Sequence, residues 1–344
     1  MKFEEALTYD DVLLVPQYSD IESRQEVDIS NELGENIYMK LPVISSPMDT
    51  VTGEGMASAM YDAGGLGVIH RYNTIKEQCE MVRNVRKTLI SRYSPRVAAA
   101  VGVSGDYLQR AVNLFDTGVN IICIDVAHGH HALMEKAIKS IRAEVGNTLH
   151  IMAGNVATRE GFEALAEWGA DSVRCNVGGG SICSTRIQTG HGMPGLQTIF
   201  ECAAAESDVK IIADGGIRNP GDVVKALAAG ADFVMLGSML AGTYETPGKK
   251  VITLGGPMKE YRGMASKEAQ MDWRGKYSSD EGVATMIPYK GTVNDVLQQI
   301  RNGLASGLSY SGVRTIKELQ ENAIFVRQTV AGLGESHTHI LGKK

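Results

Sequence analysis

The sequence predicts an α/β protein, a (β/α)8 (TIM) barrel with a C-terminal flap and a helical extension. Short apolar, β-branched runs alternate with longer segments of helical periodicity, and eight such units follow one another. Glycine accounts for 39 of the 344 residues, and many glycines directly follow an apolar run. Glycines at the carboxyl ends of parallel strands are typical of a barrel face that binds a ligand. A doubly wound open sheet is the alternative.

The eight apolar runs are the expected strands, and the amphipathic segments between them are the expected helices. Continuous apolar strands alternating with helices predict a parallel sheet covered by helices. The expected strands are residues 41–45, 66–70, 97–101, 120–126, 149–153, 172–177, 210–213 and 233–236. The expected helices are residues 53–63, 75–87, 106–117, 132–145, 159–168, 195–205 and 220–229.

About a hundred residues follow the last expected strand. The polar stretch 265–285 predicts a surface flap, and residues 293–305 and 316–329 have helical spacing. We expect residues 1–344 to form one barrel domain with this extension.

Composition excludes several function classes. A formal charge of −6 without a long basic run argues against nucleic-acid binding, and no apolar run is long enough to span a membrane. Five cysteines without a CxxC pair suggest neither a disulfide framework nor a zinc site. The N-terminus lacks the pattern of a signal peptide, so we expect a cytoplasmic protein.

The most informative segment is the loop of residues 176–186, which follows the sixth expected strand. Gly178, Gly179 and Gly180 leave the backbone bare, Ser181 supplies a hydroxyl, and Cys183 follows two residues later. A loop thiolate is a strong nucleophile when a neighbouring group orients it. The other cysteines lie within strand or helix patterns and are expected to be buried: Cys79, Cys123, Cys175 and Cys202.

A second pattern follows the seventh and eighth expected strands. Gly215 and Gly216 follow Asp214, and Gly237 precedes Ser238. Barrels often bind phosphate through backbone N–H groups of the loops at these two positions. We therefore expect a phosphorylated substrate, with Asp214 accepting hydrogen bonds from ribose hydroxyls.

Weaker signals lie after other strands. The histidines at 128, 130 and 131 follow the fourth expected strand and are interpreted as a solvated or cofactor-facing loop rather than a metal site. Asp125 is a better candidate for contact with a cofactor. Met48 and Met264 lie on loops where they could pack against a purine ring. No GxGxxG opens a βαβ unit, so a Rossmann site has no support.

Six separated motifs are distributed over nearly the whole chain. They are Leu7-Thr8-Tyr9-Asp10-Asp11-Val12-Leu13-Leu14, Ser45-Ser46-Pro47-Met48-Asp49-Thr50, Gly180-Ser181-Ile182-Cys183, Ala213-Asp214-Gly215-Gly216-Ile217-Arg218, Met235-Leu236-Gly237-Ser238 and Tyr261-Arg262-Gly263-Met264. In this order, they resemble the IMP dehydrogenase/GMP reductase family. The resemblance implies a (β/α)8 barrel, usually a homotetramer, that binds a purine nucleoside monophosphate and attacks purine C2 with a loop cysteine.

The resemblance also implies a role for each matching residue. Cys183 would be the nucleophile, Asp214 would hold the ribose, and Asp125 would face the nicotinamide cofactor. The carbonyls of Gly178, Gly180 and Cys183 match the family's potassium site. The phosphate would be held by Ser181, Gly216, Gly237, Ser238 and Tyr261, and Gly215 would lie in the same substrate-binding loop. The rest of the nucleotide would be surrounded by Ser46, Met48, Gly263 and Met264. Asn176 and Ala265 depart from the family pattern, which usually has glycine at both positions.

The flap favours the reductase activity within this family. Dehydrogenases have a long flap with an adjacent Arg-Tyr pair that activates water, whereas here 16 residues separate Met264 from Glu281, and Arg274 and Tyr277 are not adjacent. Thr185 and Glu281 match the reductases' catalytic pair, and Glu281 would also lie near the cofactor. The stretch from residue 86 to 97 leaves no room for the CBS-domain pair of many dehydrogenases.

We therefore expect an NADPH-dependent GMP reductase that converts GMP into IMP and ammonia through a Cys183 thioimidate. The N-terminal third and the tail 330–339 look more like bacterial dehydrogenases, so an NAD-dependent IMP dehydrogenase without CBS domains is the alternative. A non-catalytic purine nucleotide sensor is a third interpretation, which the retention of Cys183, Thr185 and Glu281 argues against.

Overall fold

The computed structural model describes residues 4–89, 96–278 and 280–338. Within these residues, eight parallel strands close into a barrel in the order β10-β11-β4-β5-β6-β7-β8-β9. The strands are β4 (Val43–Ser45), β5 (Leu66–Ile69), β6 (Ala98–Val101), β7 (Ile121–Asp125), β8 (His150–Val156), β9 (Ser172–Cys175), β10 (Lys210–Asp214) and β11 (Phe233–Leu236). Every expected strand exists, the last with the expected ends and the others with shifted ends, and the barrel prediction is confirmed.

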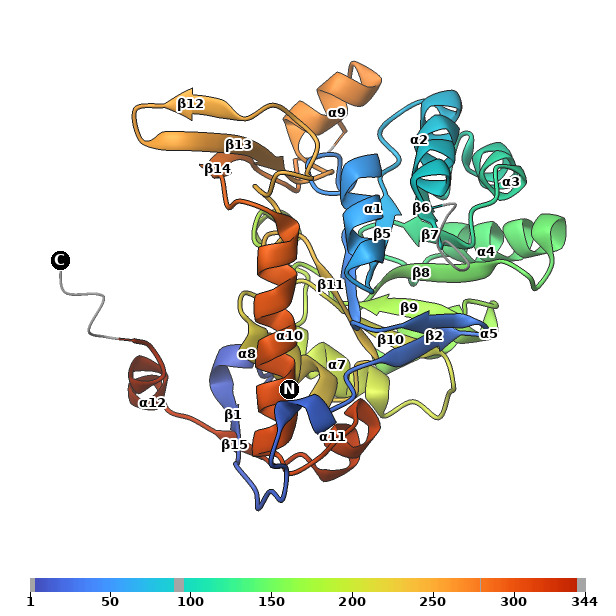
Figure 1. The fold of residues 1–344 in the computed structure, drawn as a ribbon. Helices are drawn as coiled ribbons and strands as arrows, with labels where there is room; N and C mark the ends of the chain where they lie inside the picture. Colours follow the sequence, from blue (N-terminus) through green and yellow to red (C-terminus); the bar gives the residue numbers. More distant parts are fainter. Residues whose placement is uncertain (1–3, 90–95, 279, 339–344) are drawn as a thin grey trace.

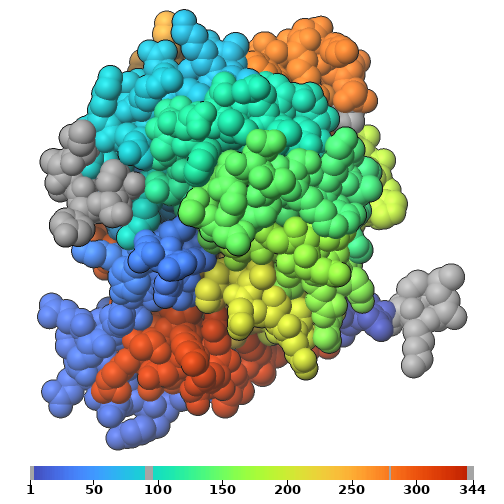
Figure 2. All heavy atoms as spheres, turned by 90° about the vertical axis from the view of Figure 1, so that its right-hand side faces the viewer, coloured from blue at the N-terminus to red at the C-terminus, as the bar shows by residue number. Residues whose placement is uncertain are grey.

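Helices cover the outside of the barrel (Figure 1). Those expected between the strands are α1 (Glu54–Asp62), α2 (Ile75–Thr88), α3 (Tyr107–Asp116), α4 (Ala132–Val145), α5 (Arg159–Glu167), α7 (Gly195–Ala203) and α8 (Pro220–Ala228). Figure 2 shows α2 to α5 as neighbouring bands, from cyan to yellow-green, over one outer face. Local signals fix their starts: Thr74 and Glu77 form a reciprocal capping box at the start of α2.

The barrel strands are buried on both faces, and alternate residues point to two different cores. Ala98 and Ala100 belong to the cluster inside the barrel, whereas Ala99 and Val101 pack in the layer beneath the helices. The hairpin of β2 (Asn31–Gly34) and β3 (Ile37–Met39) adds apolar side chains to the inner cluster. These are Leu33, Ile37 and Met39. The barrel interior is therefore a packed core rather than a channel.

The C-terminal extension packs on the barrel but differs from the expected pair of helices. Helix α10 (Val293–Tyr310) packs against α8 and α1, and extends beyond its expected end. The predicted helix 316–329 is wrong in its second half, because α11 (Ile316–Asn322) ends early. Strand β15 (Phe325–Arg327) follows and pairs antiparallel with β1 (Val12–Leu14). This pairing with the distant N-terminal segment overrides the local helical spacing. Helix α12 (Val330–Glu335) follows β15.

The flap region lies beside the carboxyl ends of the barrel strands (Figure 1). Strands β12 (Val251–Thr253), β13 (Gly256–Arg262) and β14 (Ala284–Pro288) form an antiparallel sheet there. Helix α9 (Lys267–Arg274) lies between β13 and β14. The expected flap 265–285 therefore contains a helix and the first two residues of β14, and residue 279 lies outside the described residues.

Candidate active site

A cavity of about 280 Å³ opens at the carboxyl ends of the barrel strands, next to the flap. Its lining residues are Ser46, Met48, Ala127, Gly179, Gly180, Ser181, Ile182, Cys183, Thr185, Asp214, Gly215, Gly216, Ile217, Arg218, Met235, Leu236, Gly237, Ser238, Tyr261, Gly263, Met264, Ala265 and Glu281. The predicted catalytic residues and all the predicted nucleotide-binding residues therefore line one cavity. Asp125 and Gly178 are the predicted site residues that do not line it.

Cys183, Thr185 and Glu281 form a hydrogen-bonded chain on the cavity wall. The Cys183 thiol donates to the Thr185 hydroxyl across 3.1 Å, and that hydroxyl donates to Oε2 of Glu281 across 2.8 Å. Cys183 is partly exposed, whereas the other cysteines are buried. The arrangement provides a thiol nucleophile with a carboxylate that can receive its proton through one hydroxyl.

Backbone hydrogen bonds hold Glu281, which lies between α9 and β14, next to Thr185. The N–H of Ser184 donates to the carbonyl of Glu281 across 3.1 Å, and the N–H of Val283 donates to Ile182 across 3.0 Å. The N–H of Glu281 in turn donates to Ala265 across 3.2 Å. Residues 281–283 therefore lie as a short extended segment against the loop of residues 176–186, called the nucleophile loop below.

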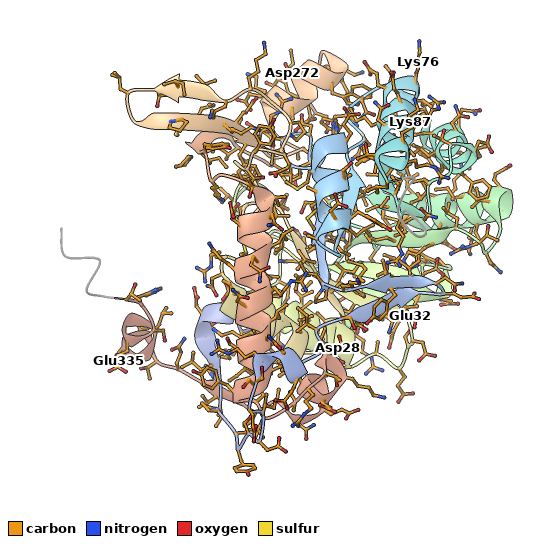
Figure 3. All side chains as sticks on the ribbon, viewed as in Figure 1. Asp28, Glu32, Lys76, Lys87, Asp272 and Glu335 are labelled. Carbon is orange, nitrogen blue, oxygen red and sulfur yellow. The ribbon has the colours of Figure 1, made fainter. Side chains whose placement is uncertain are left out.

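Helix α9 is attached to the barrel by polar and aromatic contacts. Arg262 donates to Asp49 through Nε and Nη2, and its Nη1 lies 2.5 Å from Asp272 on α9. Asp272 is labelled in Figure 3, where α9 lies above the barrel. Tyr72 stacks on Trp273 of α9 with ring centroids 6.0 Å apart, and its hydroxyl donates to the carbonyl of Met264. These contacts therefore fix the position of α9 on the barrel.

One end of the cavity presents backbone N–H groups without backbone acceptors. Among the described residues, no backbone carbonyl accepts from the N–H groups of Ser181, Gly215, Gly216, Gly237 or Ser238. Positive φ angles of 96° and 79° at Gly215 and Gly216 produce the turn that exposes two of these groups. Such a concave group of free N–H donors suits a phosphate.

The phenol of Tyr261 adds a further donor at this end. Its oxygen lies 3.4 Å from Oγ of Ser181, and a Cβ on Gly237 would lie 3.2 Å from it. Burial raises the pKa of Tyr261 above its usual value, so the hydroxyl stays protonated at neutral pH. Tyr261 and Ser181 can therefore both donate hydrogen bonds to an anion.

Asp214 lines the same cavity as Cys183 and the exposed N–H groups. Its Oδ2 accepts two hydrogen bonds from Arg174, at 3.0 and 2.8 Å, and one from Asn155 at 2.9 Å. In the described part of the chain, the side-chain hydrogen bonds of Asp214 all end on Oδ2. This leaves Oδ1 as the oxygen available to vicinal hydroxyls of a ligand.

Arg174, on β9, also binds Asp125, the last residue of β7. Its Nη1 lies 2.7 Å from Oδ1 of Asp125, while Nε of Arg71 lies 3.3 Å from Oδ2. Burial alone would raise the pKa of Asp125, but the Arg174 and Arg71 guanidinium groups outweigh it and lower the pKa below its usual value. Asp125 is thus an ionised, arginine-bound carboxylate beside the cavity.

The apolar part of the cavity wall comes from Met48, Met264 and Met235 together with Ile182. The sulfur of Met264 accepts a hydrogen bond from the N–H of Asp49 across 3.3 Å. This contact joins the β4 loop to the loop after β13. Two thioether side chains on facing loops provide a polarisable surface for a flat ring.

Only two of the three predicted potassium ligands line the cavity. Gly180 and Cys183 line the cavity, whereas Gly178 does not. The Gly180 carbonyl accepts a hydrogen bond from the N–H of Cys183 across 3.1 Å, which occupies one of its lone pairs. The potassium site therefore stays a prediction.

Sequence reasoning missed Arg174 and Asn155, which orient Asp214, and Arg71, which binds Asp125. One signal was present: Arg174 is the charged residue in an otherwise uncharged buried strand, Ser172–Cys175. A buried arginine requires carboxylate partners, and the strand ends supply two.

The remaining sequence expectations concern surface and metal chemistry. His128, His130 and His131 are exposed, and the ring of His131 accepts a hydrogen bond from the N–H of Leu133 at the start of α4. Over the described ranges, no cluster of three His, Cys, Asp or Glu side chains could hold a metal ion. None of the helices in those ranges combines the length and apolarity needed to cross a membrane.

Comparisons with known proteins give a consistent set of similarities. The family model for the IMP dehydrogenase / GMP reductase domain matches residues 6–339. Inosine-5'-monophosphate dehydrogenase from Nitrosopumilus maritimus is 35% identical, over 98% of this chain and 99% of the relative. GMP reductase from Leishmania major is 32% identical over 98% of each chain. A crystal structure of GMP reductase from Trypanosoma brucei in complex with guanosine 5'-monophosphate matches with a TM-score of 0.92 and 30% identity, covering 98% of each chain.

The two sequence alignments run over 474 and 480 positions, more than the 344 residues of this chain. Relatives named dehydrogenase and relatives named reductase therefore both contain segments that this chain lacks. Its missing insert, which the sequence suggested as a sign of reductase activity, does not separate the two activities.

Proposed function

The chain belongs to the IMP dehydrogenase/GMP reductase family of oxidoreductases, and we propose that within it the protein is an NADPH-dependent GMP reductase. The observation that carries this proposal is the Cys183–Thr185–Glu281 hydrogen-bonded chain on the cavity wall. Reductive deamination requires a nucleophile for C2 and a group that protonates the leaving amine. It requires no activated water.

The nucleotide is held by the two ends of the cavity. The 5′-phosphate binds the free N–H groups of the Gly215–Gly216 and Gly237–Ser238 loops, with Ser181 and Tyr261 as hydroxyl donors. The ribose hydroxyls donate to Oδ1 of Asp214. The guanine ring then lies between Met48 and Met264, with C2 at Cys183.

The first chemical step forms a bond between the sulfur of Cys183 and C2 of the purine. The thiol proton passes through the Thr185 hydroxyl to Glu281, which returns a proton to the amine at C2. The C2–N bond breaks, ammonia leaves, and the purine remains on Cys183 as a thioimidate. Glu281 thus acts first as base and then as acid, and it ends the step ionised.

The site also fits a nicotinamide cofactor beside the nucleophile. Ala127 lines the cavity two residues after Asp125, whose ionised carboxylate can accept hydrogen bonds from ribose hydroxyls. Glu281 faces the same space. When bound, NADPH supplies the hydride that C2 needs. The chain's own residues hold the purine in place, and the Cys183 thiolate is released from C2 as IMP forms.

The flap argues against hydrolysis of the covalent intermediate. Arg274 ends α9 and Tyr277 lies beyond it, with the Lys267 ammonium 5.0 Å from the Tyr277 ring centroid. Neither Arg274 nor Tyr277 lines the cavity. In the described part of the flap, residues 265–278 and 280–285, no arginine is adjacent to a tyrosine. The absence of such a pair from the flap supports the reductase over the dehydrogenase.

Several parts of the proposal rest on family resemblance: NADPH rather than NADH, potassium at Gly178, Gly180 and Cys183, a homotetramer, and a cytoplasmic location. Parallel assays with both cofactors, with and without potassium, test the first two. Light scattering of the purified protein tests the third.

IMP dehydrogenation with NAD is the second candidate, because relatives of similar identity carry that name. Absorbance at 340 nm separates the two activities. We expect a fall with GMP and NADPH that Cys183→Ala abolishes, and no rise with IMP and NAD. A robust rise with IMP and NAD, without a fall with GMP, would replace the reductase by the dehydrogenase. Nucleotide binding without either change would favour a sensor.

A further inference from the structure

Asn176 is a buried polar residue at the root of the nucleophile loop. It directly follows β9, its side chain is 3% exposed, and its φ of 156° is uncommon for a residue other than glycine. Its N–H donates to the carbonyl of Val156 across 2.8 Å, which fixes the backbone from which the side chain projects.

The side chain reaches from the nucleophile loop to the loop that follows β10. Nδ2 of Asn176 donates to the carbonyl of Gly215 across 3.2 Å. The carbonyl of Gly215 and the N–H of Gly216 belong to one planar trans peptide and point in opposite directions. Holding the carbonyl on one side therefore aims the Gly216 N–H away from Asn176. Gly215 and Gly216 both line the cavity, and no backbone carbonyl of the described chain accepts from this N–H.

The space around the carboxamide is shaped for it. A Cβ on Gly179 would lie 2.2 Å from Nδ2 and 2.7 Å from Oδ1 of Asn176, and a Cβ on Gly195 would lie 3.3 Å from Nδ2. Gly179 and Gly195 therefore leave the room that the carboxamide fills. The side chain is wedged between the nucleophile loop, the Gly215–Gly216 loop and the start of α7.

One atom of Asn176 has no partner among the described residues. Oδ1 is buried without a hydrogen bond, which costs folding free energy. Turning the amide over would place Oδ1 against the Gly215 carbonyl, so the observed orientation is the favourable one. A residue that leaves a buried oxygen unpaired is poorly explained by stability alone, which suggests a role in the site.

We propose that Asn176 is a positioning residue for the 5′-phosphate of the nucleotide. By fixing the Gly215–Gly216 peptide, Asn176 directs the Gly216 N–H toward the phosphate. The same hydrogen bond links the Gly215–Gly216 loop to the loop that contains Cys183. The inference rests on the proposed binding of a purine nucleoside monophosphate in this cavity, but it does not depend on which reaction follows.

Substitutions of Asn176 test the inference by calorimetric titration with GMP. We expect Asn176→Gly and Asn176→Ala to weaken GMP binding about 3- to 10-fold, the effect of one neutral hydrogen bond. Asn176→Asp keeps the shape but places a carboxylate instead of a donor at the Gly215 carbonyl, so its loss should be larger. In steady-state assays KM should rise while kcat stays within about 2-fold.

A structural role predicts a different pattern. It would lower the melting temperature of all three variants, and kcat would change together with KM. Asn176→Asp would then be the least affected variant, because its side chain fills the same space. Asn120→Ala is the matched control, since Oδ1 of Asn120 accepts from the N–H of Val97 at the opposite end of the barrel. It should lower the melting temperature and leave GMP affinity unchanged.

Two outcomes separate this inference from the proposed function. If the unsubstituted protein binds neither GMP nor IMP, the proposed function fails. If it binds GMP and the three Asn176 variants bind with unchanged affinity, the positioning role of Asn176 is overturned and the proposed function stands.

Discussion

The hydroxyl of Thr185 donates a hydrogen bond of 2.8 Å to Glu281, a residue 96 positions later in the chain. The same hydroxyl accepts from Cys183 across 3.1 Å. Thr185 therefore connects a nucleophile on the β9 loop with a carboxylate on the flap. In the proposed reaction, chemistry at Cys183 therefore depends on the contact of residues 281–283 with the loop of residues 176–186.

Removing the Thr185 hydroxyl should interrupt proton transfer without changing the shape of the site. Thr185→Val replaces the hydroxyl by a methyl group, and we expect kcat for GMP to fall about 10²- to 10³-fold with little change in KM. Thr185→Ser restores a hydroxyl and should recover most of the rate. Equal kcat values for the Val and Ser variants would contradict the relay.

Glu281→Gln should slow deamination by about 10²- to 10⁴-fold, because the amide can neither receive the thiol proton nor protonate the amine. Single-turnover measurement of ammonia release is the direct readout. Asp280→Asn is the matched control: Asp280 is a neighbouring carboxylate, and its contact with the nucleophile loop is through the backbone carbonyl, which accepts from Ser184. If both variants released ammonia at similarly reduced rates, the negative charge of the flap, rather than Glu281 itself, would account for the effect.

Arg174 should be a principal source of stability at the strand ends. Its side chain is 7% exposed and pairs with Asp125 and Asp214 at 2.7 and 2.8 Å. Arg174→Met leaves Asp214 with only the Asn155 amide and Asp125 with only Arg71, and should lower the free energy of unfolding by about 3–5 kcal/mol. Arg174→Lys should recover part of the loss, and Arg159→Met, which breaks an exposed pair with Glu163, should cause no measurable change. Urea unfolding measures all three, and equal stability of Arg174→Met and the unsubstituted protein would refute this role.

His150 should make stability depend on pH. Burial lowers its pKa to about 4 from an ordinary value of 6.5, and its Nε2 lies 2.8 Å from Oγ of Ser172. Between these two pH values the unfolded chain binds a proton that the folded chain excludes. The free energy of unfolding should therefore fall as the pH drops from 6.5 to 4, by about 2–3 kcal/mol in total.

Unfolding experiments across this pH range check the His150 prediction. His150→Asn should reduce the slope of stability against pH, whereas His130→Asn, which changes an exposed histidine, should not. If the free energy of unfolding depended on pH with the same slope in the His150 variant and in the unsubstituted protein, other groups would be the cause of the pH dependence.

The sequence predicted the barrel well because its signals are local. Continuous apolar strands and helical periodicity are patterns within a few residues, and the caps that Thr74 and Asn219 form in the structure are equally local. The elements that it missed depend on distant partners. Strand β15 exists because Phe325–Arg327 pairs with Val12–Leu14, and no local pattern reveals that pairing.

The same distinction applies to the site. The glycine loops at strand ends and Cys183 predicted where the cavity lies. The six sequence motifs predicted most of the residues that line it. Geometry was needed for Arg174, which bridges two carboxylates, and for Asn176, which reaches Gly215. Asp125 was predicted beside the cofactor, but its binding to Arg71 and Arg174 follows only from the folded structure.

The central claim is that Cys183 displaces ammonia from GMP before any hydride is delivered. The most direct test mixes the protein with GMP alone, measures ammonia, and analyses the peptide that contains Cys183 by mass spectrometry. The account predicts a burst of about one ammonia per Cys183, with the purine nucleotide attached to that peptide and absent in Cys183→Ala. The absence of ammonia and of an adduct, in a protein that oxidises IMP with NAD, would contradict it.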